Sequence, residues 1–301
     1  MSVIVSGSSG VPYGVKQVCR VWDVSRSTMY WQRQQAKTPR TEPRKRPGPR
    51  GACSDNELVA HIKQLIEESP FHGEGYRKMW ARLRFAHIRT SKERVRRLMR
   101  EHGLQAPHRV GHPHGPKAHD GSIRTEVPNE MWGTDTTTTV TTKEGQAAVM
   151  IAVDHCSFEC VGIHAAKSGN RFETLEPIRQ GVRERFGRFE EATAQGLSLR
   201  HDHGSAYVSD HFQNEIEYLG ITSSPAFVRE PEGNGCAERF VRILKENLLW
   251  VRTFATIEEL RLALWEFKER YNTQWILQRG AYRTPREAAL DASRRLSAQA
   301  A

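Results

Sequence analysis

The hydrophobic periodicity of this sequence changes after Asn129 from helical to extended, and that change restricts the fold more than any other feature. Strands and helices follow it in a fixed order, beginning with three extended runs at hairpin spacing. The runs are residues 131–141, 147–154 and 160–165, then a helix at 172–186, a strand at 197–201, a helix at 209–219 and a strand at 221–223. Because this order needs hairpin and crossover connections together, it predicts an α/β domain with a mixed sheet.

The order of these elements is the one found in ribonuclease-H-like domains. We therefore predict a mixed five-stranded sheet with flanking helices over residues 129–252, followed by C-terminal helices over residues 253–301. Trp132, Trp250 and Trp265 are expected to belong to the core of this region, because burying a large aromatic side chain stabilises a fold strongly.

Residues 1–35 form the first of two predicted helical modules. Apolar residues at helical spacing between positions 13 and 22 indicate one short helix, and Ser25 is a suitable N-cap for a second. This outline is typical of a helix-turn-helix, although a plain helical hairpin has the same pattern. The second helix would present side chains suited to phosphate and base contacts, namely Arg26, Ser27, Thr28 and Arg33.

Residues 53–106 form the second predicted module, which contains three short helices and also resembles a helix-turn-helix in outline. Ser54 and Glu57 have the spacing of a capping box at the start of its first helix. In its last helix the apolar residues Val95, Leu98 and Met99 share one side, which leaves the basic residues on the others. The basic residues that we expect to contact DNA are Lys92, Arg96 and Arg97.

Positive charge is concentrated in the N-terminal part of the chain. Residues 1–128 carry 24 Lys and Arg against 11 Asp and Glu, whereas residues 129–301 carry 21 against 24. The segments 36–52 and 107–128 are rich in proline together with arginine or histidine, so we predict that they are linkers. A zinc site in the second linker is disfavoured, because no cysteine pair accompanies its histidines. Such a basic half is typical of proteins that bind nucleic acid, although basic helices are also often simply solvated.

The sequence contains no signal for secretion or for a membrane. It has no run of about 18 apolar residues and no apolar stretch behind a charged N-terminus. Its five cysteines have no regular spacing, which indicates reduced thiols. Cys156 and Cys160, near His155 and His164, are expected to be buried thiols rather than zinc ligands. These features predict a protein of the bacterial cytoplasm, associated with the nucleoid.

Three carboxylates stand where an α/β domain places reactive groups. Asp135 lies inside the first strand, Asp202 follows the fourth strand, and Glu238 lies in the first turns of a helix. If the fold brings them together they repel one another, so a cation is needed to neutralise them. Oxygen ligands favour Mg²⁺ or Mn²⁺, and two such ions about 4 Å apart activate a hydroxyl and stabilise the leaving oxygen of a phosphodiester.

The sequence around these acids resembles the D, D(35)E pattern of retroviral-integrase-like transposases, since 35 residues separate Asp202 from Glu238. The motifs WGTDT, DHGSAY, SPAF and GNGCAERFVRILK are similar to those in the catalytic protein of insertion sequences of the IS-three group. Upstream, VSRSTMYW, GYRKMWARLR and RVRRLMREHGL are similar to that group's two helical modules, so the likeness spans nearly the whole chain. The resemblance implies a DDE-type polynucleotidyl transferase that cleaves DNA at the ends of an insertion sequence and transfers the strands.

The resemblance also implies DNA contacts and partners. In this group a lysine position on the helix of the third acid contacts terminal DNA, and it corresponds to Lys245, which lies seven residues after Glu238 on nearly the same helix face. Arg242, one turn after Glu238, is a further candidate. The group implies double-stranded DNA as the substrate and a homo-oligomer bound to it. It commonly makes its full transposase by a frameshift that fuses an upstream-frame protein to a chain like this one.

Two departures from the group's pattern concern residues outside the acidic triad. His203 stands where many relatives have asparagine, and YNTQWILQRGAYRTP follows the group's C-terminal pattern only loosely. Two other functions stay open from the sequence. One is a DNA-binding protein without chemistry, such as an element repressor or a domesticated relic, and the other is a nuclease that only hydrolyses. The presence of all three acids favours an enzyme, since a relic would be expected to lose at least one of them.

Overall fold

The structure is a computed structural model that describes residues 5–37, 53–107, 123, 125–226, 234–278 and 281–300. The chain divides into two compact units, residues 1–50 and 51–301. Most of both predicted linkers, at 38–52 and 108–122, lies outside the described residues. In the described part of the chain, no helix is both long and apolar enough to cross a membrane.

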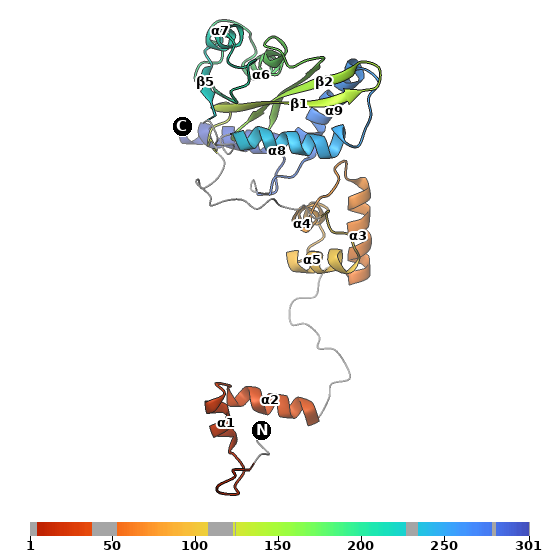
Figure 1. The fold of residues 1–301 in the computed structure, drawn as a ribbon, viewed down its shortest axis with the longest axis vertical. Helices are drawn as coiled ribbons and strands as arrows, with labels where there is room; N and C mark the ends of the chain where they lie inside the picture. The colour runs from red at the N-terminus through yellow and green to blue at the C-terminus, as the bar shows by residue number, and fades with distance from the viewer. Residues whose placement is uncertain are drawn as a thin grey trace. The chain divides into compact units, whose positions relative to one another are not determined.

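The larger unit is built on a five-stranded sheet with the strand order β3-β2-β1-β4-β5 (Figure 1). β1, β2 and β3 pair antiparallel, whereas β4 pairs parallel to both β1 and β5. The strands are β1 (Met131–Thr141), β2 (Gly145–Asp154), β3 (Cys160–Ala166), β4 (Ser198–His201) and β5 (Thr222–Pro225). The predicted mixed α/β sheet is confirmed, and each strand boundary lies within about two residues of the predicted one.

Helices cover both faces of this sheet (Figure 1). One face packs against α8 (Gly235–Leu244), its π-helical continuation η3 (Lys245–Leu249) and α9 (Ile257–Gln274). The other packs against η1 (Glu173–Leu175), α6 (Glu176–Phe186) and α7 (Asp210–Tyr218). Side chains of a strand alternate between faces, and Asp135 of β1 pairs with Ile151 of β2, which belongs to the core beneath α8 and α9. Asp135 is therefore on the α8 side of the sheet.

The three tryptophans predicted for the core differ in burial. Trp132 is fully buried, as predicted, and packs between β1 and α6. For Trp250 and Trp265 the prediction was wrong, because their exposed fractions are 69% and 56%. The inward positions of α9 are taken by neighbours such as Leu264 and Phe267, which leaves Trp265 on the outer side of the helix. Trp250 directly follows η3, and its direction is set by that π-helical turn.

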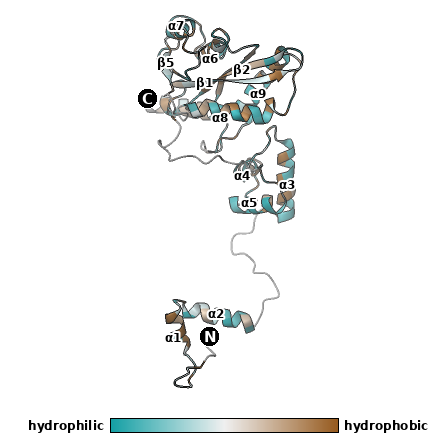
Figure 2. Cartoon of the chain, viewed as in Figure 1, coloured by the Kyte–Doolittle hydropathy of each residue, from teal (hydrophilic) through white to brown (hydrophobic). Residues whose placement is uncertain are grey.

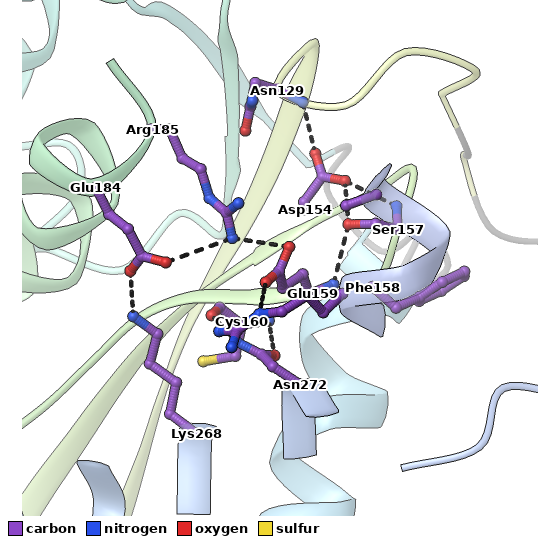
Figure 3. Close-up of polar contacts among 12 residues, drawn as sticks. Asn129, Asp154, Ser157, Phe158, Glu159, Cys160, Glu184, Arg185, Lys268 and Asn272 are labelled. Carbon is purple, nitrogen blue, oxygen red and sulfur yellow. Dashed lines mark hydrogen bonds and ion pairs between the residues drawn. The ribbon is translucent and has the colours of Figure 1, made fainter. Parts of the chain in front are cut away.

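A cluster of buried carboxylates lies where β2 ends and β3 begins (Figure 3). Asp154 accepts hydrogen bonds from the backbone N–H groups of Asn129 and Ser157 and from the Ser157 hydroxyl. Glu159 is paired with Arg185 of α6 at 2.8 Å and with Arg286 of α10 (Pro285–Ala300) at 3.4 Å. Buried charges are normally satisfied in this way, so this cluster ties α6 and α10 to the edge of the sheet.

The helices α3 (Asp55–Glu68), α4 (Tyr76–Phe85) and α5 (Lys92–Glu101) form a second core in the larger unit. The predicted capping box is confirmed, because the N–H of Glu57 donates to Ser54 Oγ at 3.3 Å and the N–H of Ser54 donates to Glu57 Oε2 at 2.7 Å. The segment between α3 and α4 joins this module to the sheet domain. Phe71 belongs to the core under α8 and α9, and the N–H of His72 donates to Asn247 Oδ1 of η3 at 2.8 Å.

The smaller unit contains α1 (Val15–Val21) and α2 (Arg26–Lys37), the two helices predicted there. The predicted N-cap is confirmed by the N–H of Thr28, which donates to Ser25 Oγ at 3.2 Å. Figure 2 shows hydrophobic residues on α1, whose sequence VKQVCRV also contains Lys16, Gln17 and Arg20. Among the described residues of this unit only Cys19 is buried, so its two helices have almost no core of their own.

Candidate active site

Asp135 sits in the middle of β1 and is partly buried beneath α8. The N–H of Thr136 donates to its Oδ1 at 2.8 Å. Burial raises the pKa of Asp135 to about 6, and the charges of Asp202 and Glu238 add to this effect. The hydrogen bond from Thr136 and the positive charge of Lys245 oppose it. Asp135 therefore lies within electrostatic range of both other acids and of the lysine.

Asp202 follows β4 directly, at the carboxyl end of a strand that is parallel to both of its neighbours. Its side chain is exposed, and its Oδ1 accepts a hydrogen bond from the N–H of Gly204 at 2.8 Å. A Cβ at position 204 would lie 2.8 Å from the same Oδ1, so glycine is required there for this close approach. The neighbouring His203 is turned away, with its Nε2 2.7 Å from the backbone oxygen of Ala226.

Glu238 lies at the surface in the first turn of α8. Partial burial of its carboxylate raises the pKa of Glu238, and the charge of Arg242 one turn later lowers it. The backbone N–H groups at a helix N-terminus also stabilise a negative charge at this position. Residues 227–233, which lead into this helix, are outside the described part of the chain.

A polar contact made by Asn234 ties the start of α8 to β1 beside Asp135. Asn234 Nδ2 donates to the backbone oxygen of Thr134 at 2.9 Å. A Cβ at Gly133 would lie 2.7 Å from both Asn234 Oδ1 and His155 Nε2, so only glycine leaves room for these two buried side chains. Because this contact joins residues next to Asp135 and Glu238, it sets the position of one acid relative to the other.

Asp135 lies within electrostatic range of both other acids, but the three are not a finished ligand set. Among the described residues, no group of three His, Cys, Asp or Glu side chains is close enough to hold a metal ion. The donors nevertheless suit a hard divalent cation, since all three supply carboxylate oxygens. Their shared negative charge, which raises the pKa of Asp135, is the kind that such a cation relieves.

The basic residues expected to contact DNA fall into three groups. Arg242 is exposed and Lys245 half-buried on α8 and η3, beside the acids. On α2, Arg26, Ser27 and Thr28 are exposed and Arg33 is half-buried. On α5, Lys92 and Arg96 are exposed, whereas Arg97 forms ion pairs with Asp55 at 2.6 Å and Glu101 at 2.8 Å. Arg97 thus has a structural role between α5 and α3.

The cysteines near the sheet edge differ in burial. Cys160 is buried, as predicted, and burial raises the pKa of its thiol to about 12, which makes it unreactive. Cys156 is half-buried rather than buried, and its Sγ lies 3.3 Å from the backbone oxygen of Glu126.

Comparisons with known proteins match both the sheet domain and the module of α3, α4 and α5. Two families described as integrase core domains match residues 126–231 and 219–275, and a family described as an HTH-like domain matches residues 54–112. A relative in Escherichia coli is the transposase InsD for insertion element IS2A/D/F/H/I/K, which is 28% identical over 239 residues. That alignment covers 77% of this chain and 78% of InsD. The chain belongs to the DDE transposases of the retroviral-integrase-like superfamily.

Solved integrase structures resemble this transposase less closely. The catalytic core domain of BIV integrase has 21% sequence identity and a TM-score of 0.41, and it covers 56% of this chain and 99% of that one. The HTLV-2 integrase catalytic core domain in complex with magnesium has 19% identity and a TM-score of 0.41, with 55% and 99% covered.

Proposed function

We propose that Asp135, Asp202 and Glu238 bind divalent metal ions, and that this transposase uses them to cleave DNA and transfer strands at the ends of an insertion sequence. One observation carries the assignment of these residues. The pKa of Asp135 is raised to about 6 by burial and by the charges of the other two acids, which come from two other elements of the fold. Perturbed carboxylates that converge from separate elements are typical of active sites.

Mg²⁺ or Mn²⁺ is the proposed cofactor, with two ions in each site, because all donors are carboxylate oxygens. Such ions, when bound, activate a water or a 3′-hydroxyl and stabilise the leaving oxygen of the phosphodiester. Asp135 would supply a ligand from β1, Asp202 from the end of β4 and Glu238 from α8. Lys245, on the same helical run as Glu238, would hold a DNA phosphate beside them.

The basic helices α2 and α5 are proposed to hold duplex DNA through Arg26, Ser27, Thr28, Arg33, Lys92 and Arg96. Most contacts of this kind go to phosphates, so they would position the DNA and not read its sequence. A DNA-binding protein without chemistry is the second candidate function, because the described residues contain no finished metal ligand set.

The test is a cleavage assay on DNA that bears the element's ends. Mg²⁺ and Mn²⁺ should support cleavage, whereas Ca²⁺ should support binding with poor turnover. Asp135→Asn and Asp202→Asn should each lower the cleavage rate more than 100-fold and leave DNA affinity nearly unchanged, since the amide removes a ligand charge but little volume. Asp210→Asn, at an exposed acid on α7, is the matched control and should cleave normally. Robust cleavage in excess chelator would remove the metal mechanism.

We also propose that the transposase acts in the bacterial cytoplasm as a homo-oligomer on DNA, and that full activity needs fusion to an upstream-frame protein. Joining two ends in concert requires two subunits and accurate recognition of the ends. The chain alone should therefore bind DNA with modest specificity and join few paired ends, and the fusion should restore both. Equal yields of joined ends from chain and fusion, on DNA carrying both ends, would contradict this.

A further inference from the structure

Trp250 is an exposed aromatic side chain at the end of the helical run that carries Glu238 and Lys245. Its exposed fraction is 69%, although tryptophan side chains are usually largely buried. Neither the core nor the proposed metal site uses it.

The π-helical turn η3 turns Trp250 toward the side of the helix that carries Glu238. The N–H of Trp250 donates to the backbone oxygen of Lys245 at 2.9 Å, a bond across five residues instead of four. In an uninterrupted α-helix Trp250 would share a direction with Ile243, seven residues earlier, whose exposed fraction is 5%. One extra residue in the turn shifts this direction by about 100°, which places Trp250 roughly in line with Glu238 and Lys245.

The exposed side of this run therefore combines an acid, two cations and an aromatic ring. Its members are Glu238, Arg242, Lys245 and Trp250. Twelve residues at about 1.5 Å each put Trp250 roughly 18 Å along the helix from Glu238. At about 3.4 Å per nucleotide, that distance corresponds to roughly five nucleotides of a bound strand. Cations that follow a backbone beside an exposed aromatic ring are typical of surfaces that bind single strands.

We propose that Trp250 stacks on an unpaired base of the DNA strand that runs from the reacting phosphate past Lys245. The proposal rests on the proposed function of the acids. A base inside a duplex hides both of its faces against its neighbours, so a protruding indole can stack only where the end is melted or frayed. Trp250 would thus make the enzyme prefer DNA ends whose strands have separated as far as roughly five nucleotides from the reacting phosphate.

The experiment compares two DNA ends of the same sequence, one fully paired and one with the terminal five nucleotides unpaired. Binding of the full chain is measured by anisotropy in Ca²⁺ buffer. The wild type should bind the end with unpaired nucleotides, the forked end, roughly tenfold more tightly than the paired end, because tenfold is the usual effect of one base–aromatic stack. Trp250→Ala should lose that preference. Trp250→Phe should retain most of it. Trp265→Ala removes a tryptophan of similar exposure from α9 and should change nothing.

Two further measurements separate stacking from charge. Lys245→Ala should weaken both ends and lower the slope of log affinity against log salt by roughly 0.9, whereas Trp250→Ala should leave the slope unchanged. A 2-aminopurine base in the unpaired strand should be quenched by the wild type and not by Trp250→Ala. If Trp250→Ala still prefers the forked end over the paired end, the stacking role is overturned. It is also overturned if the only change in this variant is in the sedimentation of the protein. If the wild type binds neither end, the proposed function fails as well.

Discussion

The sheet domain contains two groups of carboxylates in opposite surroundings. Asp154 and Glu159, at the end of β2 and the start of β3, are 2% and 1% exposed, and hydrogen bonds and arginines satisfy them (Figure 3). Asp135, Asp202 and Glu238 come from β1, the end of β4 and α8, and burial together with the charges of the two others raises the pKa of Asp135. The more deeply buried group is the better neutralised one.

We interpret this difference as one between structural acids and the acids proposed to be functional. A buried carboxylate that only supports the fold must be paired, because an unpaired buried charge costs several kcal/mol, on the order of 3–5. Carboxylates that lie close together repel one another and so oppose folding. A protein is therefore expected to retain such a group for its chemistry. Exchanging one acid for its neutral amide, or removing one of its partners, therefore affects the two groups differently.

The largest effect should come from Glu238→Gln compared with Glu159→Gln. Glu238→Gln should lower the cleavage rate more than 100-fold with little change in the free energy of unfolding. Glu159→Gln should cost about 3 kcal/mol of stability, because it removes the ion pair of the Arg185 guanidinium at 2.8 Å and leaves only the longer one to Glu184 at 3.6 Å. Urea unfolding and a cleavage assay on the same preparations check both results. The distinction between the two groups would be lost if both variants lost stability equally.

The sequence predicted the acids but not the interactions that distinguish the two groups. Asp135 stands out because it lies inside a strand, Asp202 because it follows a strand, and Glu238 because it lies in the first turns of a helix. The 35 residues between the last two also match a known pattern. Glu159 directly precedes β3, and Arg185 lies in α6. Their ion pair depends on how α6 crosses the sheet, and a local sequence pattern does not specify that crossing. The contact of Asn234 with Thr134 was not predictable for the same reason, because the two residues are 100 positions apart in the sequence.

The exposure of Trp250 was missed for a different physical reason. Helical periodicity assumes a constant 100° per residue, and the π-helical turn at Lys245–Leu249 breaks that assumption. The fold class was predictable because alternating and continuous apolar runs are directly visible in a sequence, whereas a single inserted residue within a helix is not.

A smaller effect should come from Asp135→Asn in metal-free buffer. The pKa of Asp135 in the folded protein is about 6, above its usual value of 3.8, so the folded state binds the proton more tightly than the unfolded state. The stability that this residue contributes is complete below about pH 4 and is lost as the pH rises through 6. At pH 7.5 the ionised acid therefore destabilises the fold, and Asp135→Asn should stabilise it by at most about 3 kcal/mol.

Urea unfolding at pH 4.5 and pH 7.5 measures this effect, because the difference between variant and wild type should shrink at the lower pH. Added Mg²⁺ should reverse the order at pH 7.5 by stabilising the wild type alone. Asp154→Asn is the comparison from the other group, and Mg²⁺ should not affect its stability relative to the wild type. A variant Asp135→Asn that is less stable than the wild type at pH 7.5 without metal would show that Asp135 is a structural acid after all.

The smallest effect should come from Ser157→Ala, which removes one of several hydrogen bonds to a satisfied acid. The Ser157 hydroxyl donates to Asp154 Oδ2 at 2.7 Å, while the backbone N–H groups of Ser157 and Asn129 remain to hold the carboxylate. Ser157 Oγ also accepts from the backbone N–H of Glu159 at 3.2 Å, and that bond is lost as well. The loss should be about 1–2 kcal/mol of unfolding free energy, with the cleavage rate and its dependence on Mg²⁺ unchanged. Thermal unfolding and a Mg²⁺ titration of cleavage measure the two quantities. A changed Mg²⁺ dependence in Ser157→Ala would mean that the two groups of carboxylates are coupled through the sheet, and the separation drawn between them would not hold.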